Sequence, residues 1–156
     1  MESYFTQTDP RWANIRFPFS KSTIKDIGCL ITCIANILYK RCELWTPDNV
    51  LKLLITNNGL TKDNLVVWEA VYKIFKLKHL KYTKEILKKI DKETLECDHY
   101  IIEINCGSYN HFCNIIDFQD DKIKYFDVYD GKEKEIGFDS NKLVSIRRLE
   151  SLWKSF

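Results

Sequence analysis

The chain has 156 residues, of which 45% are hydrophobic and 29% are charged, a composition typical of a globular protein and not of a disordered or fibrous one. Lys and Arg total 24 against 22 Asp and Glu, so the net charge of +2 gives no electrostatic reason to expect a nucleic-acid partner. We expect a single domain over residues 1–156, a length that suits one hydrophobic core.

Four helices are predicted in the first two thirds of the chain. The stretch CLITCIANILY is apolar at nearly every position, as in a helix enclosed by protein. In the next helix Thr46 is the candidate N-cap, Pro47 takes the first helical position and Gly59 marks the stop. Thr83 is the candidate N-cap of a lysine-rich helix. The predicted helices cover residues 28–40, about 47–57, about 64–76 and about 84–95.

The hydrophobic period changes to two in the last third of the chain, which is rich in Ile, Tyr, Phe and Val between turn-forming residues. This pattern predicts consecutive antiparallel strands. A C-terminal helix follows, with apolar residues from Leu143 to Trp153 on one face, and a short strand ahead of it is the alternative. The fold class is therefore α+β, with helices packed on an antiparallel sheet. The predicted strands cover residues 99–105, 111–118 and 122–128, with 133–138 as a candidate fourth.

The N-terminal sequence MESYFTQTDP lacks the basic and apolar blocks of a secretory signal, and the longest apolar stretch is shorter than the roughly 18–20 residues that span a bilayer. Six cysteines in such a chain indicate reduced thiols and not a disulfide framework. We expect a cytoplasmic protein without membrane association, and export by a non-standard route stays open. Eight lysines between Lys73 and Lys92 are expected on a solvated helix face, with an anionic partner as the alternative.

Cys29 stands at the entrance of the first predicted helix, in the stretch KDIGCLITCIANIL. Unpaired backbone N–H groups and the positive end of the helix dipole stabilise a thiolate at such a position. Cys33 lies one turn further into the helix and lacks this advantage. A buried cysteine that only fills space explains the same pattern, so a catalytic interpretation depends on its partners.

A nucleophilic thiol needs a base, a group that orients the base, and a donor for the oxyanion that develops on the substrate. Three histidines are available. His79 lies in the lysine-rich segment and His99 just ahead of a strand, which are positions typical of surface or packing residues. His111 opens a strand after the turn-forming sequence NCGSYN, where a base is held rigidly and still reaches solvent.

The orienting acid depends on the register of the hairpin that follows His111. A three-residue loop at 119–121 places Asp127 diagonally across from His111 on the same face. A two-residue loop at 120–121 sends the two side chains to opposite faces unless a β-bulge restores the parity. We choose Asp127 as the orienting acid and leave both loop lengths open. Asp117 is the fallback acid, although it lies some ~20 Å from His111 along the strand at ~3.3 Å per residue.

Four stretches together resemble one group of enzymes: QTDPRWANIRF, TIKDIGCLITCIANIL, HFCNIIDF and YFDVYDG. They are similar to the papain-superfamily cysteine peptidases of the bacteriocin-processing, double-glycine-leader type and their stand-alone relatives. The likeness runs from Gln7 to about Gly131 and is weakest between residues 60 and 95. Its most specific parts are the patterns Gln-x-Asp-x-x-Trp and Gly-Cys-x-x-Thr.

This resemblance implies a papain-like fold and hydrolysis of a peptide or protein substrate, with no cofactor and no metal. It implies Cys29 as the nucleophile, His111 as general base and then acid, and Asp127 as the group that orients His111. The side chain of Gln7 would donate to the oxyanion, together with the backbone N–H of Cys29. Many relatives have Gly-Pro where this chain has Leu30-Ile31 and a glycine where it has Asn110. These changes affect the cleft walls and leave the substrate open.

Two other readings of the same fold remain open: murein-hydrolase or amidase chemistry on the Cys-His pair, and a protein-binding module with an idle site. A zinc site is a further alternative, because cysteines and histidines gather in one short stretch of the sequence. Their spacing does not follow the Cys-x(2–4)-Cys pairs of structural zinc sites, so we predict no metal there. The residues concerned are Cys97, His99, Cys106, His111 and Cys113.

Overall fold

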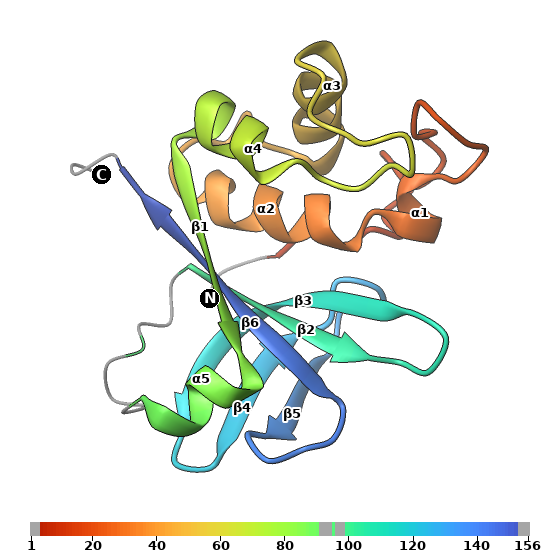
Figure 1. Ribbon diagram of the computed structural model, residues 1–156. Helices are drawn as coiled ribbons and strands as arrows, with labels where there is room; N and C mark the ends of the chain where they lie inside the picture. The colour runs from red at the N-terminus through yellow and green to blue at the C-terminus, as the bar shows by residue number, and fades with distance from the viewer. Residues whose placement is uncertain (1–3, 91–94, 96–98, 153–156) are drawn as a thin grey trace.

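A computed structural model describes residues 4–90, 95 and 99–152 of the chain and confirms the α+β class. Within these residues five helices accompany a six-stranded sheet that is antiparallel throughout (Figure 1). The strands pair in the order β1-β6-β2-β3-β4-β5. The helices are α1 (Ile24–Ile27), α2 (Cys29–Tyr39), α3 (Pro47–Thr56), α4 (Trp68–Phe75) and α5 (Lys84–Lys89). The strands are β1 (Leu77–Thr83), β2 (Tyr100–Asn105), β3 (Asn110–Gln119), β4 (Lys122–Phe126), β5 (Glu133–Gly137) and β6 (Leu143–Ser151).

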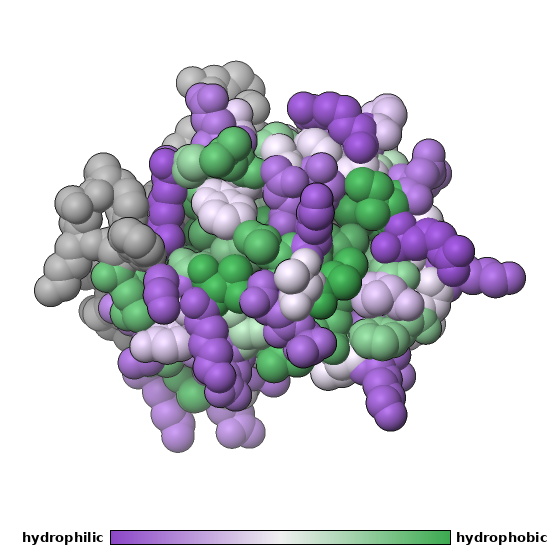
Figure 2. All heavy atoms as spheres, turned by 90° about the horizontal axis from the view of Figure 1, so that it is seen from above, coloured by the Kyte–Doolittle hydropathy of each residue, from purple (hydrophilic) through white to green (hydrophobic). Residues whose placement is uncertain are grey.

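Two hydrophobic clusters form the core, and alternate residues of the sheet contribute to each of them. Helices α1 to α4 form a layer over one face of the sheet (Figure 1), where α2 packs on β3 and buries nearly every apolar side chain it has. In β2, Ile101 belongs to this helix-side cluster, whereas Ile102 belongs to the second cluster, which includes Leu87 of α5. The outer face of the helical layer is a mixture of hydrophilic side chains and small apolar patches (Figure 2).

None of the described helices has the length and apolar character that crossing a bilayer demands. The described cysteines are all free thiols, which agrees with the expectation of reduced cysteines. Cys97 lies outside the described residues.

The predicted C-terminal helix is wrong, because residues 143–151 form strand β6, an inner strand of the sheet between β1 and β2. The apolar residues recur at a spacing of three because this strand is buried on both faces and its pairing with β2 shifts at Ile104. Leu143 and Ile146 therefore join the second cluster, whereas Leu149 joins the helix-side cluster. Trp153 lies outside the described residues.

Strand β1 is the second departure, because the sequence predicted no strand within the lysine-rich segment. Among its described lysines, Lys73 lies on α4, Lys78 and Lys81 lie on β1, and Lys84, Lys88 and Lys89 lie on α5, so they do not share one helix face. The predicted end of the last helix, near residue 95, falls partly outside the described residues. Helix α4 begins at Trp68 and not at residue 64, since Val66 bridges Leu60 in extended backbone. The short helix α1 was also not predicted.

The hairpin of β3 and β4 has the two-residue loop, the case in which a β-bulge is needed to keep Asp127 on the face of His111. Gln119 pairs with Lys122, which leaves only residues 120 and 121 in the turn. The register then shifts between Ile115 and Asp117, because Ile116 is an extra, bulged residue. This bulge restores the parity, and the pairing of Ile115 with Tyr125 brings residue 127 back to the face of His111.

A buried pair of asparagines fixes helix α2 to strand β3. The Asn36 amide donates to Asn114 Oδ1 at 2.8 Å, and the Asn114 amide donates to the carbonyl of Cys33 at 3.1 Å. The backbone N–H of Phe5 donates to Asn36 Oδ1 at 2.6 Å. The two amides therefore bind the N-terminal segment, the helix and the strand to one another inside an apolar core, where unpaired amides are costly.

Replacing Asn114 by Ala should lower the free energy of unfolding by about 2–3 kcal/mol, because Asn36 and the Cys33 carbonyl lose a buried partner. Chemical denaturation followed by circular dichroism measures this change. The matched control is Asn57→Ala, which removes an exposed amide bonded to its own helix and should cost less than about 0.5 kcal/mol. Equal losses in the two variants would contradict the role given to the buried pair.

Candidate active site

Cys29 is the first residue of α2. Just before it, the backbone at Gly28 packs closely against Ile24 of α1. A Cβ at position 28 would lie 2.5 Å from the carbonyl oxygen of Ile24, so only glycine allows α1 to approach the start of α2. The Thr32 hydroxyl donates to the Gly28 carbonyl at 2.7 Å and fixes the first turn. These contacts give the pattern Gly-Cys-x-x-Thr its structural reason. They hold a partly exposed Cys29 at the positive end of an eleven-residue helix.

Gln7 lies beside the start of α2, in an N-terminal segment that is held in place by hydrogen bonds. The Trp12 indole donates to the Thr6 carbonyl at 2.8 Å, and the backbone N–H of Gln7 donates to the carbonyl of Val128 at 2.7 Å. The buried Gln7 Nε2 donates to the carbonyls of Ile24 and Lys25 at 3.3 and 2.9 Å. Its Oε1 is buried without a hydrogen-bond partner among the described residues.

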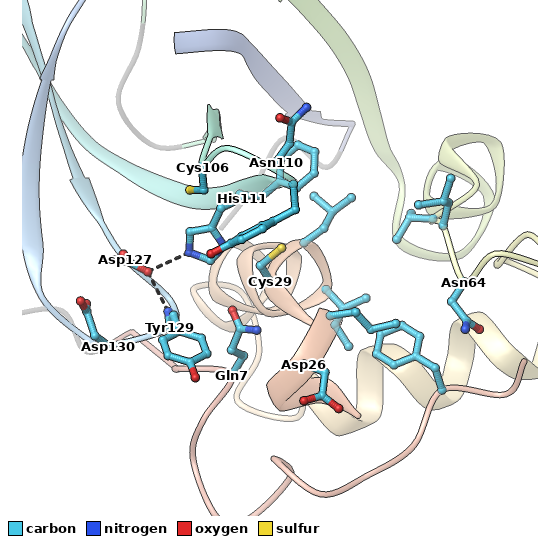
Figure 3. A pocket seen from close by; sticks show the side chains of 18 of the residues that line it. Gln7, Asp26, Cys29, Asn64, Cys106, Asn110, His111, Asp127, Tyr129 and Asp130 are labelled. Carbon is cyan, nitrogen blue, oxygen red and sulfur yellow. Dashed lines mark hydrogen bonds and ion pairs between the residues drawn. The ribbon is translucent and has the colours of Figure 1, made fainter. Parts of the chain in front are cut away.

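His111 and Asp127 form the central contact of the site (Figure 3). His111 Nε2 lies 2.8 Å from Asp127 Oδ1, and the same oxygen accepts the Tyr129 N–H at 2.9 Å. With Nε2 used in this way, Nδ1 is the ring nitrogen left for another partner. In Figure 3 the imidazole lies between the Asp127 carboxylate and the Cys29 side chain. The strand register and the bulge at Ile116 thus bring together the two side chains that sequence reasoning had paired.

Burial and charge act on this pair in opposite directions. Burial alone would lower the pKa of His111, but the hydrogen bond to Asp127 and the contacts with Cys113 and Cys29 raise it well above its ordinary value. Burial alone would raise the pKa of Asp127, but bonds from His111, Lys134 and the Tyr129 N–H hold it well below its ordinary value. The pair therefore consists of an imidazolium and a carboxylate at neutral pH.

Lys134 is a member of the site that sequence reasoning missed. Its Nζ lies 2.7 Å from Asp127 Oδ2 and 2.8 Å from Asp130 Oδ2, and these contacts raise the pKa of Lys134. Lys134 belongs to β5, opposite Tyr125 in the register. A lysine in a strand of alternating charges is normally solvated. The local sequence gives no sign that Lys134, unlike its neighbours Glu133 and Glu135, belongs to the site.

The four predicted site residues Gln7, Cys29, His111 and Asp127 line one cleft of about 630 Å³. The cleft is largely apolar away from them. Side chains of the helical layer, the 64–66 segment, the β2–β3 turn and Tyr129 also line it. The apolar lining residues are Phe17, Ile27, Leu30, Ile31, Leu65, Val66 and Phe112.

A buried ionic network supports the β2–β3 end of the cleft. Glu103 accepts hydrogen bonds from Arg147 at 3.0 Å and from Asn110, the residue before His111, at 3.0 Å. Arg147 also lies 3.2 Å from His79 Nε2, and the His79 ring stacks on Trp68. Burial and the nearby Arg147 lower the pKa of His79 to about 4, so His79 is neutral here. His79 is therefore a packing residue of this network.

The other residues considered from the sequence lie elsewhere. Asp117 faces Lys124 in the register, on the far side of the bulge from the site. Of the proposed zinc ligands, His111 and Cys113 lie together, whereas Cys106 is on the exposed β2–β3 turn and His99 precedes β2 at its other end. Cys97 lies outside the described residues. A structural zinc site built from the whole set is thus not formed by the described part of the chain.

Neither a scan against protein-family models nor a search of curated proteins gives a match for this chain.

Replacing Lys134 by Met should move the acid limb of the Cys29 alkylation rate to higher pH. The reason is that loss of the lysine contact raises the pKa of Asp127, which must be ionised to hold the His111 imidazolium. The unfolding free energy near neutral pH should fall by about 1 kcal/mol or less, since Lys134 is partly exposed. This loss shrinks at acid pH, where Asp127 of the folded chain becomes protonated and no longer pairs with a lysine.

Two variants control this measurement. Lys134→Arg keeps a cation beside Asp127 and should restore the wild-type profile. Lys124→Met removes the neighbouring ion pair with Glu133, at 3.4 Å, and should leave the limb unchanged. An unchanged acid limb in Lys134→Met would show that Lys134 does not act on Asp127.

Proposed function

We propose that this chain is a papain-like cysteine peptidase that hydrolyses peptide bonds through Cys29, His111 and Asp127. The observation that carries the proposal is the His111–Asp127 pair at 2.8 Å, lying in the same cleft as a thiol at a helix N-terminus. A base with an orienting carboxylate behind it, next to a nucleophile, is the arrangement that activates thiols and hydroxyls in hydrolases.

In the proposed reaction the Cys29 thiolate attacks the carbonyl carbon of the scissile amide, and a C–S bond forms. The His111 imidazolium, held by Asp127, then gives its proton to the leaving amine as the C–N bond breaks. Neutral His111 then takes a proton from a water molecule as its oxygen forms a C–O bond with the thioester carbonyl carbon. The C–S bond breaks, which releases the acid product and restores the Cys29 thiolate beside the His111 imidazolium. Asp127 stays ionised throughout, and Lys134 and the Tyr129 N–H support that state.

The oxyanion of the tetrahedral intermediate would form beside the first turn of α2. The N–H groups of a first helical turn have no intrahelical acceptor, so the Cys29 N–H is available as a donor. Gln7 Nε2 is the second proposed donor. Its contact with the Ile24 carbonyl is long, at 3.3 Å, and exchanging this contact for the substrate oxygen would bring the amide into its catalytic role.

The lining of the cleft favours an extended, partly apolar peptide over a cell-wall fragment. Apolar side chains dominate the wall beyond Cys29, and the rim carries Tyr109 and Tyr129, whose exposed rings suit a peptide backbone. Sugars are recognised by dense sets of hydrogen-bonding groups, whereas the helix side of the cleft adds only Asp26 and Asn64 to its apolar side chains among the described residues. The amidase alternative is therefore second to the peptidase.

Selective alkylation tests the activation of Cys29. At pH 6.5, iodoacetamide should label Cys29 roughly tenfold faster than Cys42 and Cys106. The last two are the more exposed thiols, so exposure alone predicts the opposite order. Site-resolved mass spectrometry gives the three rates in one sample. His111→Ala should remove the advantage of Cys29 and leave Cys42 unchanged, and equal rates for all three cysteines in the wild type would end the activation argument.

Turnover is tested with a diverse library of unfolded peptides, analysed by mass spectrometry before and after incubation. The wild type should cleave a subset that Cys29→Ala leaves intact, and Gln7→Ala should lower kcat by roughly 10²-fold through loss of an oxyanion donor. Cell-wall fragments are incubated in parallel. Cleavage of those fragments alone would favour the amidase, and no turnover of either substrate despite an alkylation-competent Cys29 would favour a binding role.

A further inference from the structure

Cys113 is a second thiol at the site, and the proposed reaction does not use it. It is fully buried on β3, two residues after His111, and its side chain faces both His111 and Asp127. One donor atom from each of His111, Cys113 and Asp127 lies within 4.8 Å of the others. The three residues thus present a nitrogen, a sulfur and an oxygen to a common point.

The strands impose this arrangement. Residues 111 and 113 share one face of β3 because side chains alternate along a strand. Asn114 pairs with Phe126, so the same register places Cys113 opposite Asp127, just beyond the end of β4. The cluster is therefore a product of the same bulged hairpin that forms the His111–Asp127 pair, and it is rigidly held by backbone pairing.

The geometry points to a zinc ion as the ligand of this cluster: we propose that His111, Cys113 and Asp127 form an inhibitory Zn²⁺ site. Imidazole, thiolate and carboxylate are the three ligand types that zinc prefers, at about 2.0–2.3 Å, so two ligand atoms on one ion are about 3.3–3.8 Å apart. Because the three donor atoms lie within 4.8 Å of one another, no separation exceeds that range by more than about 1 Å. His111 lines the cleft and gives the ion a route from solvent.

Zinc binding and peptide hydrolysis would exclude each other at this site. The ion takes the imidazole and the carboxylate that the proposed reaction needs, and it replaces the protons now held by the Cys113 thiol and the His111 ring. Both protons must leave, so affinity rises with pH. Lys134, 2.7 Å from the other Asp127 oxygen, keeps a positive charge near the ion and weakens binding, as a reversible inhibitor site requires.

This inhibitory role rests on the proposed peptidase function, but the binding itself does not. Zinc affinity is measured on the purified full chain by competition with a chromophoric zinc chelator, with zinc sulfate as the only added metal. The wild type should bind one ion per chain at micromolar or lower concentration, and Cys113→Ala should weaken binding at least tenfold. The matched control Cys42→Ala removes an exposed thiol outside the cleft and should bind like the wild type.

A second readout reports inhibition without requiring turnover. Stoichiometric zinc should slow alkylation of Cys29 at least tenfold in the wild type, because His111 is withdrawn from it, and should have a much smaller effect in Cys113→Ala. Cys113→Val, which fills the same space without a ligand, replaces the Ala variant if thermal melting shows that the cavity destabilises the fold.

The outcomes separate the two proposals. Absence of micromolar zinc binding in the wild type, or equal affinity in the wild type and both Cys113 variants, overturns the zinc site and leaves the peptidase untouched. If Cys29 is not activated in metal-free protein, the proposed peptidase function is overturned. The chelator titration still tests the zinc site in that case. Zinc that binds through Cys113 without slowing Cys29 overturns the inhibitory role.

Discussion

The interaction on which the site depends is the buried contact between Asn36 and Asn114. The groups of the cleft come from three separate parts of the chain: the N-terminal segment with Gln7, helix α2 with Cys29, and the β3–β4 hairpin. The two asparagine amides are bonded to all three parts at once. Apolar packing alone allows helix and sheet to slide, whereas buried amides are satisfied in very few relative positions. Polar bonds inside the core therefore determine how far the sulfur lies from the imidazole.

Charge is arranged along a line from the exposed rim into the protein. Lys134 faces one oxygen of Asp127, and His111 faces the other. This alternation of cation, anion and cation keeps each partly buried group ionised, which none would be alone in an apolar environment. Beyond them, the Glu103–Arg147 pair repeats the same solution at the β2–β3 turn, where it holds the segment that leads into His111. The cleft is thus supported by two sets of paired charges, one at Asp127 and one at Glu103, and by the apolar packing of the helical layer.

Local patterns were sufficient where a residue's role depends on its own element. The N-terminus of α2, the proline start of α3 and the run of antiparallel strands follow from capping and alternation, and Cys29 and His111 follow from the ends of those elements. The misses are positions where tertiary context decides. Strand β6 has apolar residues on both faces because it lies inside the sheet, and its spacing imitates a helix. Lys134 acquires its role only when β5 pairs with β4, a contact that no local spacing encodes.

The bulge at Ile116 makes chain length, as much as residue type, a determinant of chemistry in this protein. The side chains of His111 and Asp127 share a face only because one extra residue compensates the even-numbered turn. Point changes along the hairpin leave this count intact, whatever they cost in packing or buried hydrogen bonds. A gain or loss of one residue between positions 112 and 126 inverts the parity and turns the two groups away from each other. Insertions and deletions, rather than substitutions, are consequently the changes that this hairpin tolerates least.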